Sequence, residues 1–89
     1  MTEIDRSACT AAQRDAIWEF LRARTVDKPG HNIARRVLFG LCCRWLESNP
    51  DHRVPIDNDS FRAALDAAGY GIRHMRGTEL VTGIDLLPR

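Results

Sequence analysis

With 89 residues, the chain can form one small domain whose core buries a modest share of its surface. Its 44% hydrophobic and 28% charged residues are ordinary for a globular protein, and a formal net charge of +1 excludes a protein that coats nucleic acid through bulk positive charge. The sequence has no apolar run of the ~20 residues that a membrane span needs and no signal-peptide layout, so we expect a cytoplasmic protein without a membrane contact.

The first helix is predicted from its N-terminal cap. Residues 1–9 show no hydrophobic period and are expected to form a flexible arm, followed by a single domain over residues 10–89. Thr10 and Gln13 fit a capping box, which predicts a helix that ends near Arg24. Trp18 lies off the apolar stripe, so it either covers the edge of the core or contacts a partner. The stripe consists of Gln13, Ala16, Ile17, Phe20 and Leu21.

The middle of the chain is predicted to hold a loop, a short strand and the longest helix. Lys-Pro-Gly at 28–30 cannot continue a helix, so 25–30 is predicted to be a loop, with a short strand at 31–33 that can pair with a later hairpin. A helix is expected over 34–48, where Gly40 costs ~1 kcal/mol relative to alanine and therefore suggests close approach of a neighbouring helix. Its expected inward face is Ile33, Val37, Leu38, Leu41, Cys42, Trp45 and Leu46.

The last third reads as a helix that runs directly into a hairpin. Asp57 suits an N-cap, and Ile56 with Phe61 has the spacing of a hydrophobic staple. Gly69 suits the left-handed residue that ends a helix, and strands at 70–75 and 78–84 flank the short link Arg76-Gly77. The expected inward face of this helix is Phe61, Ala64, Leu65 and Ala68.

The predicted order of helix, short strand, helix, helix, strand and strand is that of a winged helix-turn-helix. This is an α+β fold of three helices plus a small antiparallel β-hairpin, in which the third helix is the recognition helix and the hairpin is the wing.

Several short motifs follow one another in the order found in a known family. They are Ile17-Trp18-Glu19-Phe20-Leu21, Pro29-Gly30, Leu41-Cys42-Cys43-Arg44-Trp45-Leu46, Pro55-Ile56-Asp57, Phe61-Arg62-Ala63-Ala64-Leu65, Gly69-Tyr70, Arg73-His74-Met75-Arg76-Gly77 and Thr82-Gly83-Ile84. Over residues 13–87 the chain thereby resembles the C-terminal winged-helix domain of poxvirus-type primase–helicases of phages, prophages and plasmids. The resemblance implies a winged-helix, replication-associated DNA-binding module in a bacterial host cell. The chain has no Walker-type or primase segment, and its third helix is more acidic than is usual in that family.

Outward-facing polar residues are the candidate contacts to double-stranded DNA. On the third helix, Asn58 and Arg62 can pair with adenine and guanine in a major groove. Arg62 has Asp59 and Asp66 as helix-face neighbours, so it can instead be held in an ion pair with them. Contacts to the phosphate backbone are expected from the wing and from the start of the second helix, namely Arg73, His74, Arg76, Arg35 and Arg36.

A protein-interaction module is the other hypothesis that the sequence leaves open. The acidic third helix, with Asp59 and Asp66, can occupy a basic surface of a partner in a DNA-handling complex. Trp18 and Tyr70 are the aromatic candidates for such an interface. The sequence does not decide between a monomer and a dimer.

The sequence contains no motif that indicates catalysis or metal binding. His31, His52 and His74 are far apart, and no pair has His-x₃-His or Cys-x₂-Cys spacing, so we expect no metal and no cofactor. Cys42 and Cys43 point roughly 100° apart on a helix and cannot chelate one ion. No base accompanies a serine or cysteine nucleophile, so we expect no enzyme activity.

Overall fold

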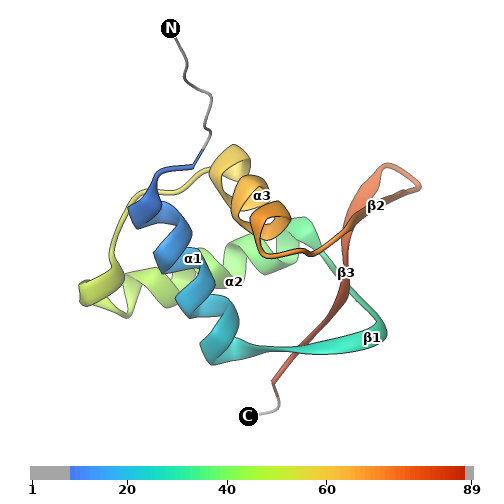
Figure 1. Cartoon of the computed structure of the whole chain (residues 1–89), viewed down its shortest axis with the longest axis horizontal. Coiled ribbons are helices and arrows are strands. Elements are labelled where there is room, and N and C mark those ends of the chain that lie inside the picture. The colour runs from blue at the N-terminus through green and yellow to red at the C-terminus, as the bar shows by residue number, and fades with distance from the viewer. Residues whose placement is uncertain (1–8, 88–89) are drawn as a thin grey trace, which may run out of the picture.

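The computed structural model describes residues 9–87, so the predicted arm lies, apart from Cys9, outside the described residues. Three helices gather on one side of a three-stranded antiparallel sheet (Figure 1), and the chain is therefore a small α+β domain. In chain order the elements are α1 (Ala11–Arg24), β1 (Thr25–Ala34), α2 (Arg35–Glu47), the 3₁₀ turn η1 (Pro50–His52), α3 (Asn58–Ala67), β2 (Ile72–Met75) and β3 (Thr78–Leu86).

Helix α1 begins and ends where its sequence predicts. The Thr10 hydroxyl accepts from the Gln13 backbone N–H at 3.1 Å, and the Gln13 side chain accepts from the Thr10 N–H at 2.9 Å, which confirms the capping box. Trp18 is half-buried, and its indole N–H donates to the Ala64 carbonyl at 3.0 Å. Trp18 therefore covers the edge of the core and ties α1 to α3. The buried face is Ala16, Ile17, Phe20 and Leu21.

The loop predicted at residues 25–30 is wrong, because these residues belong to β1, which runs antiparallel to β3. Thr25 to Asp27 pair with Ile84 to Leu86, and pairing resumes at Asn32 after a shift in register. Lys28-Pro29-Gly30 lies in that irregular stretch. There Pro29 needs no backbone N–H to donate to the neighbouring strand, and Gly30 can adopt a φ of +86°. The short strand predicted at 31–33 does pair with the hairpin, through Asn32 to Ala34 against Leu80 to Thr82.

Helix α2 has the predicted extent but a rotated inward face. Val37 was expected in the core and is 53% exposed. Phe39, which lies on the opposite flank of Leu38, instead packs edge-to-face on Phe61 of α3 with ring centroids 5.4 Å apart. The reason is that α3 covers the Phe39 flank and leaves the Val37 flank open. The close approach expected at Gly40 is also wrong, since a Cβ there would meet no atom within 4 Å.

Helix α3 is capped at both ends by local contacts. The Asp57 carboxylate accepts from the Ser60 N–H at 2.8 Å, and Ser60 Oγ accepts from the Asp57 N–H at 2.9 Å. Gly69 has a φ of +92°, as predicted for the residue after the helix. Ala68, predicted to face inward, is exposed because the helix ends at Ala67 and the chain then turns away. The buried face is Ser60, Phe61, Ala64 and Leu65.

The hairpin is confirmed, with Arg76 and Gly77 both at positive φ (51° and 77°), as in a two-residue type I′ turn. The strand order is β1-β3-β2, and Val81 and Ile84 of β3 are buried in the core. Glu79 is two positions from Val81, so both side chains lie on the sheet face that packs against the helices. None of the described helices is long and apolar enough to cross a membrane.

Candidate nucleic-acid interface

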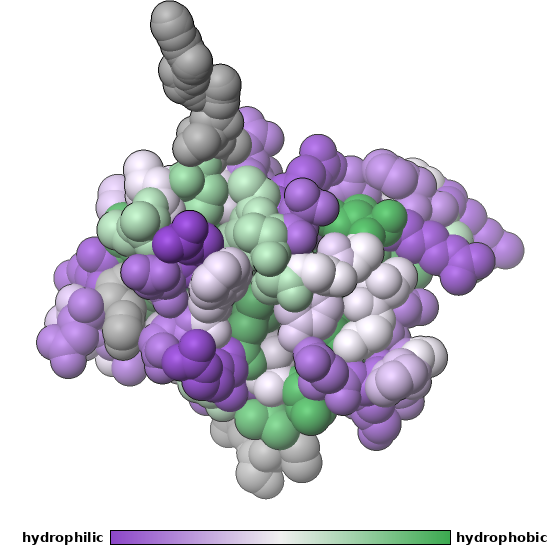
Figure 2. All heavy atoms as spheres, in the orientation of Figure 1, coloured by the Kyte–Doolittle hydropathy of each residue, from purple (hydrophilic) through white to green (hydrophobic). Residues whose placement is uncertain are grey.

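A groove of about 620 Å³ separates α3 from the β2–β3 hairpin. One wall is formed by the outward side of α3, and the other by the start of β2 and by Glu79 of β3. Hydrophilic side chains gather over the hairpin beside it (Figure 2). The groove residues are Asp59, Arg62, Ala63, Asp66, Tyr70, Gly71, Ile72, His74 and Glu79.

Glu79 is the electrostatic centre of this groove, since it binds arginines from two different helices. One carboxylate oxygen accepts from Arg35 Nε–H of α2 at 2.5 Å, and the other accepts from the Arg62 guanidinium of α3. His74 Nε2 lies 3.7 Å from the same oxygen that contacts Arg62. The hydrogen bonds from Arg62 and then Arg35 lower the pKa of Glu79 to about 2, so the carboxylate is ionised at neutral pH.

The predicted ion pairs of Arg62 with Asp59 and Asp66 do not form. Within residues 9–87 the ion-pair partner of Arg62 is Glu79, whose hydrogen bond raises the pKa of the guanidinium. The sequence placed the acids that could neutralise Arg62 on its own helix face, whereas in the structure the acid comes from the hairpin. Asp59 and Asp66 are exposed and form no ion pair with any described residue.

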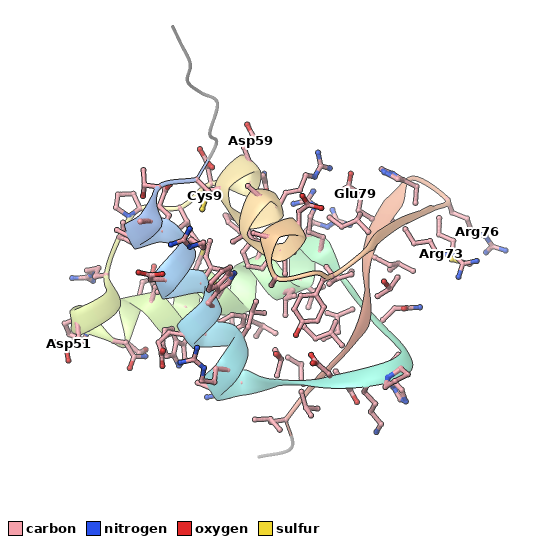
Figure 3. The ribbon with its side chains drawn as sticks, viewed as in Figure 1. Cys9, Asp51, Asp59, Arg73, Arg76 and Glu79 are labelled. Atoms are coloured by element: carbon pink, nitrogen blue, oxygen red, sulfur yellow. The ribbon has the colours of Figure 1, made fainter. Side chains whose placement is uncertain are left out.

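The structure divides the predicted DNA contacts into two groups. The first group converges on Glu79, and Asn58 joins it because its side-chain oxygen accepts from Arg35 Nη1 at 2.9 Å. Arg73 and Arg76 form the second group at the end of the hairpin, where both project outward (Figure 3). Arg36, at the start of α2, is exposed as well. Among the described residues, Arg36, Arg73 and Arg76 have no acidic partner.

Glu79 lies in the groove but is absent from the site residues predicted from the sequence. Its position opposite His74 could have been predicted from the sequence, because the tight turn at Arg76-Gly77 fixes the register of the hairpin. Its contacts with Arg35 and Arg62 join residues 44 and 17 positions away in the chain. No local pattern encodes those contacts.

The two aromatic residues proposed for a partner interface have polar atoms that are satisfied within the domain. Trp18 binds the Ala64 carbonyl, as described above, and the Tyr70 hydroxyl donates to Asp27 at 2.5 Å. Partial burial, followed by that hydrogen bond, raises the pKa of Tyr70 to about 12. Tyr70 therefore connects the start of the hairpin to β1 and stays neutral at physiological pH.

In the described part of the chain, no group of three or more histidine, cysteine or acidic side chains is arranged to hold a metal ion.

No protein-family model, curated protein or solved structure matches this chain. The resemblance to the winged-helix domain of primase–helicases therefore stays a prediction from the sequence.

Proposed function

We propose that this domain is a winged-helix protein that binds double-stranded DNA and contacts the phosphate backbone chiefly through its wing. The order α1-β1-α2-α3-β2-β3, with a hairpin directly after the third helix, is compatible with that fold. The observation that carries the proposal is the pair Arg73 and Arg76, exposed at the hairpin end with no acidic partner among the described residues. Arginines without an acidic partner on a projecting hairpin suit contact with phosphate oxygens.

Helix α3 is expected to contribute less to DNA binding than the wing does. Arg62 is engaged with Glu79, and the exposed carboxylates of Asp59 and Asp66 would repel phosphate if the helix entered a groove deeply. The domain should therefore read little base sequence and bind DNA mainly by charge. With Arg73, Arg76 and Arg36 as phosphate contacts, log K should fall against log salt with a slope of about −2 to −3.

The biological setting follows from the resemblance alone. A domain similar to the C-terminal winged helix of phage or plasmid primase–helicases fits a replication-associated module of a mobile element. Such a module would hold duplex DNA during replication.

The test is fluorescence anisotropy with a generic labelled duplex at ~50 and ~200 mM salt, where counterion release separates charge-driven binding from other modes. The double variant R73A/R76A should weaken binding and make the salt slope shallower by about 2. R44A/R53A is the matched control, because it removes the same charge from exposed residues of the α2 end and the segment after η1. Asp51 of η1 lies at the opposite end of the molecule from the wing (Figure 3). Absence of any affinity at ~50 mM salt would sink the proposal.

A protein-interaction module is the second candidate, and a different observation favours it. Asp59 and Asp66 are exposed acids on one wall of a groove whose lining also includes half-buried Ala63, Tyr70 and Ile72. Such a surface fits a basic segment of a DNA-handling partner. Replacing both acids by asparagine should abolish capture of that partner from a host lysate. A D59N/D66N bait that captures the same protein as the unchanged bait would remove the reason for this candidate.

A further inference from the structure

The arginines nearest to the proposed recognition helix are already occupied by an acid of the domain itself. Arg35 and Arg62 reach Glu79 from different helices, and each binds a different oxygen of its carboxylate. The side chains of Arg35 and Glu79 are only 18% and 16% exposed, whereas that of Arg62 is 49% exposed. The Arg35–Glu79 ion pair is thus shielded from solvent, whereas the Arg62–Glu79 ion pair is open to the groove.

A guanidinium recognises carboxylate and phosphate oxygens in the same way, by charge-assisted N–H donation. A cluster built to hold two carboxylate oxygens can therefore hold two oxygens of a phosphate. His74, whose side chain is 74% exposed, would supply a third donor from the wing.

We infer that Arg35, Arg62 and His74 form a latent site for a DNA backbone phosphate, which the carboxylate of Glu79 keeps occupied in the free protein. The inference rests on the proposed DNA-binding function and deepens it. When Arg73 and Arg76 engage the duplex, a neighbouring phosphate competes with Glu79 for Arg35, Arg62 and His74. The wing thus makes the first contact, and the helix arginines are recruited only afterwards.

The surrounding charges specify the ligand as a polyanion. Asp59 and Asp66 line the same groove and oppose a free anion, so inorganic phosphate should not displace Glu79. A duplex that is already held by the wing presents its next phosphate at a high effective concentration. Protonation does not open the site near neutral pH, because the pKa of Glu79 lies at about 2.

The decisive comparison is E79Q against D66N. Both variants remove one negative charge from the same groove, but Asp66 has no arginine partner among the described residues. E79Q should bind the generic duplex about tenfold more tightly than the unchanged chain, whereas D66N should gain only about twofold from general electrostatics. The salt slope should steepen by about 1 to 2 in E79Q alone, and adding R62A to E79Q should reverse most of the gain.

Equal affinities for E79Q and D66N, or weaker binding by E79Q, would overturn the inference and assign Glu79 a purely structural role. Binding by the unchanged chain that depends on Arg73 and Arg76 would in that case leave the proposed function intact. Absence of affinity in every variant would remove the function and the latent site together.

A second measurement keeps the inference testable if E79Q does not fold. In the unchanged protein, the side-chain N–H resonances of Arg62 should shift during titration with the duplex and remain fixed during titration with inorganic phosphate. An Arg62 signal that stays fixed at saturating duplex, while those of Arg73 and Arg76 move, would refute the latent site.

Discussion

Replacing Phe61 by alanine tests the packing on which the whole wing arrangement depends. The Phe61 side chain is fully buried, and its ring packs edge-to-face on Phe39. Truncating a buried phenylalanine to alanine costs about 3–5 kcal/mol, to which the lost ring pair contributes roughly 0.5–1.5 kcal/mol. At roughly 0.05–0.15 kcal/mol per residue, this chain has a total stability of about 4–13 kcal/mol. The substitution should therefore remove roughly a quarter or more of the stability and can unfold the domain outright.

Val37→Ala is the matched control, because a purely sequence-based assignment places Val37 in the core whereas the structure leaves it 53% exposed. Its cost should stay at about 0.5 kcal/mol, as for other surface substitutions. Urea unfolding followed by the fluorescence of Trp18 and Trp45 gives both free energies by linear extrapolation. A loss below about 1 kcal/mol for F61A, or similar losses for both variants, would refute the described packing of α2 and α3.

Two further predictions concern Gly40 and Glu79. Gly40→Ala should stabilise the domain by about 0.5–1 kcal/mol, because alanine is the better helix former and its Cβ meets nothing within 4 Å; a lower urea midpoint would show a neighbour that the structure lacks. Since the folded-state pKa of Glu79 is about 2, below the ~4.3 of an unperturbed glutamate, its ion pairs stabilise the fold above about pH 5 and are lost as the pH falls towards 2. Between pH 6 and pH 3 the unchanged chain should therefore lose more unfolding free energy than E79Q does, and equal slopes in thermal or urea unfolding would contradict the role of Glu79.

The elements that the sequence predicted correctly are those fixed by contacts between near neighbours. The cap at Asp57 and Ser60 joins residues three positions apart, and Gly69 meets a backbone requirement at a single position. The turn at Arg76-Gly77 likewise depends on its own two residues. Such signals are complete within a few residues and need no knowledge of the remaining chain.

The predictions that failed depend on segments that are distant in the chain. Residues 25–30 contain Pro29 and Gly30 and resemble a loop, yet residues 25–27 pair with β3, so the segment belongs to strand β1. Val37 and Phe39 flank Leu38 symmetrically, and only the position of α3 decides which of the two is covered. Propensity cannot choose in either case, because the deciding partner lies across the fold.

The sequence by itself determined the caps, the turn and the order of helices and strands, since each is set by short-range hydrogen bonding and periodicity. Only the tertiary structure decided which arginines have acidic partners. Arg35 and Arg62 both have Glu79 as their acidic partner, because packing brings α2, α3 and β3 together around one carboxylate. Arg73 and Arg76 remained exposed because the hairpin carries them away from the helices. The sequence shows which residues carry a charge, but only the folded structure shows which charged residues form ion pairs with one another.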